Sequence, residues 1–210
     1  MAPPTLVRRP FRYSYGNAAL WLIAANILVF ALSMLFPRLS YWLALNPLAV
    51  LAGAWWQPFT YMFAHSGFSH LLFNMLGLFF FGSAVEKSLG TKEFLLYYLL
   101  AGLVAGLASF AVYIFVGSMN TFLLGASGAI FALLLAYATI FPDARIFVWG
   151  ILPVRAPLLV LGYAGIELFS EFTSYDPSVA HLTHLAGFGI GWLYFLARFG
   201  INPARRFFAR

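Results

Sequence analysis

Long apolar stretches separated by short polar segments dominate the pattern of residues along this chain. A helix that crosses the hydrocarbon core of a bilayer needs about 20 mostly apolar residues. Six stretches approach or reach this length, at roughly residues 17–36, 70–89, 94–116, 127–141, 157–172 and 181–199. The pattern therefore predicts an all-α membrane protein in which six helices cross the bilayer.

The positions of the lysine and arginine residues give these helices a direction. Most of them precede the first stretch, flank the turn after the second, lie between the fourth and fifth, or follow the sixth: Arg8, Arg9, Arg12, Lys87, Lys92, Arg145, Arg155, Arg198, Arg205, Arg206 and Arg210. If six helices alternate in direction, all of these lie on one side of the membrane and Arg38 alone lies on the other. Because positive residues collect in cytoplasmic segments, we expect both termini in the cytoplasm.

Composition supports a membrane protein and excludes several other classes. Of the 210 residues, 63% are hydrophobic and only 9% are charged, which is too little charge to cover a soluble domain. The chain has no cysteine, which excludes disulfides and thiolate metal sites. The formal charge of +6 does not indicate a nucleic-acid partner, because the positive residues lie where they set membrane orientation. We expect a cytoplasmic segment at 1–16, a six-helix domain at 17–200 and a short basic cytoplasmic tail at 201–210.

Two features predict how parts of this domain pack. Residues 37–69, between the first two predicted helices, are apolar, rich in tryptophan and almost free of charge. Such a segment is expected to lie in the membrane interface or to dip into the bilayer. In the third predicted helix, Gly102 and Gly106 form a pair of small residues four positions apart, which predicts close helix packing.

Polar residues occur at matching positions in three of the predicted helices. The second helix carries His70 and Asn74 on one face, the fourth begins near Ser127, and the sixth carries His181 and His184. These three helices enter from the same side, so their first turns are expected at similar depth in the outer part of the membrane. Ionisable residues there are costly and are functional candidates by default.

Among these residues, only serine is a suitable nucleophile. Its hydroxyl needs a neighbouring base, and a histidine from another helix can supply one. Ser127 also stands at a helix start, where free N–H groups and the helix dipole favour the oxyanion of acyl transfer. Gly125 and Gly128 are expected to let a substrate backbone come close.

Each of these features has a plainer interpretation when it is taken alone. A serine between glycines is most often a packing site, and a single histidine is often a satisfied core residue. Their coincidence at one depth favours catalysis. Metal binding by the four histidines, His65, His70, His181 and His184, is a weaker alternative, because no helix has the His-Glu-x-x-His pattern.

Four local patterns resemble those of the rhomboid family of intramembrane serine proteases. They are His65, His70 and Asn74; Gly82, Glu86 and Gly90; Gly125, Ser127 and Gly128; and His184, Gly187 and Gly191. Their order and spacing match over residues 55–192. The resemblance implies a rhomboid-like bundle of six transmembrane helices with a membrane-embedded outer loop between the first and second.

The resemblance also implies a role for each site residue. Ser127 would be the nucleophile and His184 the general base of a Ser–His dyad. The oxyanion hole would consist of His70, Asn74 and the Ser127 N–H group. Gly187 and Gly191 would let the sixth helix approach the fourth. Glu86 would be structural rather than catalytic.

The implied function is cleavage of transmembrane segments of membrane proteins near their outer end, without metal or cofactor. The expected partners are such substrates and the lipid bilayer, and the expected location is the bacterial inner membrane. Substrates would reach the site sideways, past the fifth helix and the loop near residues 174–180. Two alternatives are an inactive relative that binds membrane proteins without cutting, and a proton-coupled transporter. Both catalytic residues are present, however, and the paired carboxylates or repeats typical of a transporter are not.

The sequence departs from the family pattern at three places. Gln57 stands where an arginine follows tryptophan in many members, Thr183 stands where alanine often precedes the histidine, and His181 is an additional histidine one turn before His184.

A carboxylate could in principle complete a catalytic triad. Glu167 is expected to lie below the depth of the site, and only Glu171 and Asp176 could reach it. Asp176 lies in a loop that is expected to move, and Glu171 is expected to face the membrane interface. We therefore predict a dyad. Ring stacking or backbone contacts would then hold His184.

Overall fold

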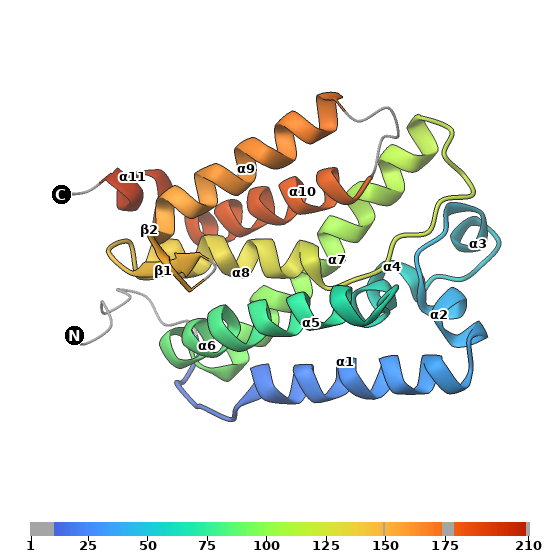
Figure 1. The fold of residues 1–210 in the computed structure, drawn as a ribbon, viewed down its shortest axis with the longest axis horizontal. Helices are drawn as coiled ribbons and strands as arrows, with labels where there is room; N and C mark the ends of the chain where they lie inside the picture. Colours follow the sequence, from blue (N-terminus) through green and yellow to red (C-terminus); the bar gives the residue numbers. More distant parts are fainter. Residues whose placement is uncertain (1–10, 149, 174–178, 209–210) are drawn as a thin grey trace.

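The computed structural model describes residues 11–148, 150–173 and 179–208, and these form a mostly helical bundle (Figure 1). Its long helices are α1 (Ala18–Leu35), α7 (Thr91–Phe115), α8 (Ser127–Ile140), α9 (Ala156–Thr173) and α10 (Val179–Tyr194). A further long helix combines α5 (Phe68–Gly77), the π-helical turn η2 (Leu78–Gly82) and α6 (Ser83–Leu89), and a second π-helical turn, η3 (Phe195–Phe199), extends α10. Helices therefore occupy all six stretches that the apolar pattern predicted.

Three helices in the described part of the chain are long and apolar enough to cross a membrane. They are Ala18–Leu35, Phe68–Leu89 and Thr91–Phe115, and the apolar helix Ser127–Ile140 is shorter. Most long helices run along one axis, and the start of α1 lies at the same end of the molecule as α11 (Pro203–Phe208) (Figure 1).

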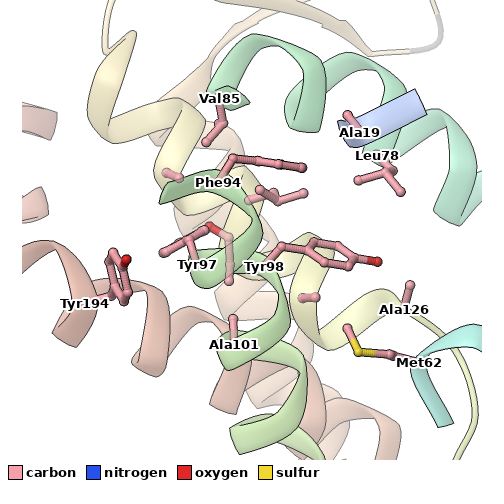
Figure 2. Close-up of a cluster of buried hydrophobic side chains, with 14 of the residues drawn as sticks. Ala19, Met62, Leu78, Val85, Phe94, Tyr97, Tyr98, Ala101, Ala126 and Tyr194 are labelled. Atoms are coloured by element: carbon pink, nitrogen blue, oxygen red, sulfur yellow. The ribbon is translucent and has the colours of Figure 1, made fainter. Parts of the chain in front are cut away.

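Helix α7 forms the centre of the main hydrophobic core. Its buried aromatic side chains, including Phe94, Tyr97 and Tyr98, lie between residues of α1 and α6 on one side and Tyr194 of α10 on another (Figure 2). The Tyr97 hydroxyl donates to the carbonyl of Ala132 in α8 at 2.6 Å. α7 thus supports both α8 and α10, the two helices that carry Ser127 and His184.

The segment between α1 and α5 folds into short helices at one end of the bundle (Figure 1). These are α2 (Arg38–Leu43), α3 (Pro47–Leu51), α4 (Gln57–Thr60) and the 3-10 turn η1 (Tyr61–Phe63). Gln57 is buried; it accepts a hydrogen bond from the Asn46 N–H at 3.0 Å and donates to the Trp42 carbonyl at 3.3 Å. Neutral hydrogen bonds made by Gln57 therefore hold this loop together.

The small residues Gly102 and Gly106 of α7 pack against this loop. A side chain at Gly102 would overlap the end of Met62, and one at Gly106 would approach Tyr61 at 2.5 Å. The Tyr61 hydroxyl also donates to the Gly102 carbonyl at 2.7 Å. The close packing predicted for this pair is present, but its partner is the loop rather than another long helix.

Glu86 anchors the start of α1. Its two carboxylate oxygens accept hydrogen bonds from the N–H groups of Ala18 and Ala19 at 2.8 and 2.9 Å, and it is fully buried. The first N–H groups of a helix have no partner within the helix and favour negative charge. These contacts support the structural role predicted for Glu86.

Three elements were not anticipated from the apolar pattern, a pair of strands and a short helix. Strands β1 (Arg145–Val148) and β2 (Leu152–Arg155) pair antiparallel between α8 and α9. Helix α11 buries Phe207 in a second hydrophobic cluster with residues of α8, α9 and α10. Part of the expected basic tail is therefore packed against the bundle.

Candidate functional site

Ser127 and His184 lie in direct contact although 57 residues separate them. Ser127 is the first residue of α8, and His184 lies in the second turn of α10. The His184 Nε2 atom is 2.8 Å from the Ser127 Oγ atom. This is the hydrogen-bond distance that a base needs to remove the hydroxyl proton.

Glycine makes this contact geometrically possible. A Cβ atom at Gly187 would overlap the carbonyl oxygen of Gly128, and one at Gly191 would lie 2.5 Å from the Tyr97 hydroxyl. α10 can therefore lie against α8 only because these positions have no side chain. Next to His184, the buried Thr183 makes a 2.6 Å hydrogen bond to Ser109 of α7, which fixes α10 against a second helix.

The imidazole ring of His184 stacks on Phe131 of α8. The ring centroids are 4.1 Å apart and the planes differ by only 4°. This is the kind of ring stacking that the sequence led us to expect. It fixes the plane of the imidazole while leaving both nitrogens at its edge for polar contacts.

A carboxylate also reaches this histidine, and it comes from an unexpected residue. The Oε1 atom of Glu167 lies 3.0 Å from the His184 Nδ1 atom, and its Oε2 atom lies 2.5 Å from the His181 Nδ1 atom. The expectation that Glu167 lies below the depth of the site is therefore wrong.

The position of Glu167 follows from the antiparallel pairing of α9 and α10. Glu167 is six residues before the end of α9, and His184 is five residues after the start of α10. Residues equally far from a short connection lie at the same depth in two antiparallel helices, so counting from the connection would have revealed this contact. Of the other two candidates, Asp176 lies outside the described residues, and the Glu171 Oε2 atom is buried with no hydrogen-bond partner among those described.

His70 and Asn74 lie beside this centre on α5. The Asn74 Nδ2 atom donates to the His70 carbonyl at 2.7 Å, which uses one of its two N–H groups. Asn74 and Ser127 line the same cavity of about 370 Å³, together with apolar residues of α5, α8 and α9. The Nδ1 atom of His70 lies 3.0 Å from the Ser66 Oγ atom.

The space next to two glycines is filled by protein groups. Gly125 has a φ of +113°, which favours glycine, and a Cβ atom there would lie 2.6 Å from the His70 Nε2 atom. A Cβ atom at Gly128 would meet Ala105 and Thr183, both at 3.0 Å. These two glycines thus allow close packing inside the protein, and the approach of a substrate past them remains a prediction.

The four histidines fall into two separate pairs. His65 is buried outside the long helices and its ring meets the edge of His70 at a centroid distance of 5.1 Å. Burial, followed by the charge of His70, lowers the pKa of His65 to about 4, so this ring is neutral at physiological pH. The other pair, His181 and His184, shares Glu167, and the donor atoms of these three residues lie within 4.8 Å of one another. The sequence offered all four histidines as a weaker, metal-binding alternative. Among the described residues, the cluster with metal-ligand spacing consists instead of Glu167, His181 and His184.

Comparison with known proteins places the chain in a family. A profile of the Rhomboid domain matches residues 52–200. The chain is 38% identical over 90 residues to the putative rhomboid protease YdcA of Bacillus subtilis, covering 43% of each protein. It is 41% identical over 85 residues to the rhomboid protease GluP of the same organism, covering 40% of this chain and 16% of that protein. With the rhomboid protease GlpG of Salmonella paratyphi A it shares 27% identity over 175 residues, covering 81% of this chain and 58% of that protein.

The profile covers well over half of the chain, and the chain therefore belongs to the rhomboid family. It spans between 16% and 58% of the length of the three relatives named above. Family membership and the long apolar helices together make it a multi-pass membrane protein.

Proposed function

We propose that this protein is an intramembrane serine endopeptidase in which Ser127 is the nucleophile and His184 is the general base. The observation that carries the proposal is the 2.8 Å contact between the Ser127 Oγ and His184 Nε2 atoms inside a bundle of apolar helices. Polar pairs within the membrane, such as this partly buried one, are costly and mark functional sites. The names of the rhomboid relatives support the same activity.

The chemistry follows the acyl-transfer pattern of serine hydrolases. The Ser127 Oγ atom attacks the scissile carbonyl while His184 Nε2 takes the hydroxyl proton, and the same imidazolium then protonates the leaving amine. The peptide C–N bond breaks and an ester to Ser127 remains. Water, deprotonated by His184, hydrolyses this ester and restores both residues.

The proposed oxyanion hole consists of the Ser127 N–H group, Asn74 and His70. Ser127 begins α8, so the N–H groups of the first turn have no partners within the helix. These groups can stabilise the negative charge that develops on the oxyanion. The Asn74 amide uses one N–H for the His70 carbonyl and has a second N–H left to donate, and Asn74 lines the same cavity as Ser127. His70 lies next to the loop that precedes Ser127, through its contact with Gly125.

The proposed substrates are transmembrane segments of other membrane proteins, cut near their outer end. Helix α8 has 14 residues and is about 21 Å long, shorter than the roughly 30 Å hydrocarbon core. Ser127 at its start would therefore lie below the outer membrane surface. The apolar cavity beside Ser127 is lined from α5, α8 and α9, which supports access from the side between α5 and α9, with movement of α9 and of the loop near residues 174–180. A helical peptide bond must be unwound before attack, so residues such as Gly and Pro should favour cleavage.

We further propose six membrane crossings, with both termini cytoplasmic and the short helices α2–α4 embedded at the outer face, in a bacterial inner membrane. The catalytic domain would comprise residues 17–200. The even number of crossings is supported by the start of α1 and α11 lying at one end of the bundle, opposite α2–α4 (Figure 1). It is also supported by the lysine and arginine residues, which would otherwise be scattered over both sides.

Single cysteines test this topology directly, because the natural chain contains none. Ser118→Cys, in the connection between α7 and α8, should react with an impermeant maleimide applied to intact cells, as should Ser178→Cys in the connection before α10. Asn202→Cys should react only after the membrane is permeabilised. Labelling of Asn202→Cys from outside in intact cells would show that the orientation is wrong.

The catalytic proposal is tested by a fluorophosphonate probe and a cleavage assay on the purified protein in liposomes. We expect the probe to label Ser127, as located by mass spectrometry, and a co-reconstituted single-span substrate to be cut within or beside its span. An inactive relative would neither label nor cut. A transporter would fail both assays while moving protons or solute across the vesicle membrane, and either pattern would contradict the proposal.

A further inference from the structure

We propose that Glu167 is a positioning residue that holds the His184 imidazole with its proton on Nδ1, and that His181 shares this carboxylate. This inference rests on the proposed function and replaces the expected dyad with a Ser127–His184–Glu167 arrangement. Glu167 touches neither Ser127 nor the proposed substrate cavity in the described contacts, so it would act through His184.

The first argument is the way both carboxylate oxygens are used. Glu167 is only 7% exposed, and a buried carboxylate is costly unless its oxygens find donors. Oε1 lies 3.0 Å from the His184 Nδ1 atom and Oε2 lies 2.5 Å from the His181 Nδ1 atom. Each carboxylate oxygen therefore faces one ring nitrogen, which indicates that the two histidines hold Glu167 in a specific orientation.

The second argument is that the proposed reaction requires one particular tautomer. A neutral imidazole carries a single proton. For Nε2 to accept the proton of Ser127, that proton must be on Nδ1. An ionised carboxylate can only accept hydrogen bonds, so Glu167 selects this form.

No other described contact of the ring makes this selection. Stacking on Phe131 fixes the plane of the His184 ring but is the same for either tautomer. The Ser127 hydroxyl can donate or accept, so its 2.8 Å contact with Nε2 is compatible with both. Selection of the catalytic tautomer therefore falls to Glu167.

The Glu167 Oε1 and His184 Nδ1 atoms lie within hydrogen-bond distance, but the angle between them does not yet favour a hydrogen bond. Although Nδ1 is 3.0 Å from Oε1, it makes no hydrogen bond of good angle. Catalytic hydrogen bonds are often poorly aligned before substrate binds and tighten in the reacting complex. A small rotation of the carboxylate would complete this bond, and its charge would then stabilise the imidazolium that forms during attack.

His181 makes the role of Glu167 testable through a specific chemical asymmetry. A carboxylate accepts from both Nδ1–H groups at once, whereas the amide of glutamine offers one acceptor oxygen and one donor NH₂ group. In Glu167→Gln the two histidines must compete for that oxygen. Whenever the NH₂ group faces His184, the His184 proton is driven to Nε2 and the ring cannot act as base. Removing His181 as well should free the amide oxygen for His184.

The experiment compares Glu167→Gln, His181→Ala, the double variant and Glu171→Gln in the liposome cleavage assay. The corresponding change in a soluble triad lowers kcat by ~10⁴ because the tautomer is wrong. Because competition with His181 is only partial, we expect Glu167→Gln to lower kcat by about 10²–10³, with KM little changed. His181→Ala should lose less than about tenfold, and the double variant should be about tenfold faster than Glu167→Gln alone. Glu171→Gln makes the same change one turn further along α9 and should stay within about tenfold of the natural protein.

Any one of the following results would overturn the positioning role. The first is a folded Glu167→Gln variant with natural kcat, and the second is a double variant slower than Glu167→Gln. The third needs no variant: ¹⁵N shifts of the labelled natural protein that place the His184 proton on Nε2. If a chelator abolishes activity and Zn²⁺ restores it, Glu167, His181 and His184 hold a metal ion instead, and the inference is also wrong.

These outcomes are separable from failure of the proposed function. If the natural protein does not react with the fluorophosphonate probe, Ser127 is no nucleophile and the proposed activity fails. If it reacts normally and Glu167→Gln reacts equally fast, the proposed activity stands and the positioning role fails.

Discussion

Ser127→Ala and His184→Ala are each expected to abolish cleavage of a transmembrane substrate, with kcat falling by about 10⁶, as when the nucleophile or base of a soluble serine protease is removed. The physical reason is that Ser127 supplies the attacking oxygen and His184, 2.8 Å away, supplies the only base in contact with it among the described residues. Loss of either leaves no pathway to the acyl-enzyme. Product formation in liposomes, followed by gel or mass spectrometry over several hours, measures the effect.

The control for this prediction is that both variants keep the fold. Ser127→Ala removes one oxygen atom, and its elution volume and thermal unfolding in detergent should match those of the natural protein. His181→Ala, one turn before His184, provides a matched histidine deletion that should lose less than about tenfold in activity. A folded Ser127→Ala variant that still cuts at the natural rate would end the protease interpretation.

Gly187→Ala is also expected to have a large effect, although it touches neither catalytic side chain. The added Cβ atom would overlap the carbonyl oxygen of Gly128, so α10 must move away from α8. A displacement of about 1 Å in a catalytic arrangement can cost 10²-fold in rate, and we expect kcat to fall by at least about 10². Overpacking should also lower the unfolding temperature, since it typically costs about 1–3 kcal/mol. Kinetics in liposomes and thermal unfolding in detergent measure both effects.

Gly189→Ala is the matched control for this variant. It makes the same change two residues further along α10, where no atom lies within 4 Å of the added Cβ position. Activity and unfolding temperature should both stay close to those of the natural protein. Equal activity in Gly187→Ala and Gly189→Ala would show that the close approach of α8 and α10 is not required for catalysis.

The helices and the Ser127–His184 contact could be predicted because their signals are local in the sequence. Apolar length alone indicates where helices run, and alternating direction brings the first turns of three helices to one depth. The close approach at Gly187 was implied by the resemblance to the rhomboid family, and small residues physically permit it. The polar pairs at this depth needed no knowledge of side-chain rotamers.

Other contacts depend on distances that the sequence pattern does not contain. The depth of Glu167 depends on where α9 ends and α10 begins, and a shift of a few residues in either boundary changes its partner. The partner of Gly102 is Met62 of the loop, and nothing in α7 distinguishes a loop from a helix as the neighbour. The strand pair at residues 145–155 and the packing of Phe207 involve short segments, whose periodicity is too brief to read.

The location of Glu167 on α9 has a consequence for the order of events in a catalytic cycle. If α9 swings outward to admit a substrate, it carries the carboxylate away from His184, and the ring loses the partner that fixes its tautomer. The base would then be switched off for as long as the gate is open, and would recover only when α9 returns with the substrate in place. Such an interlock would spare membrane proteins that merely sample the opening, and it would make cleavage conditional on closure.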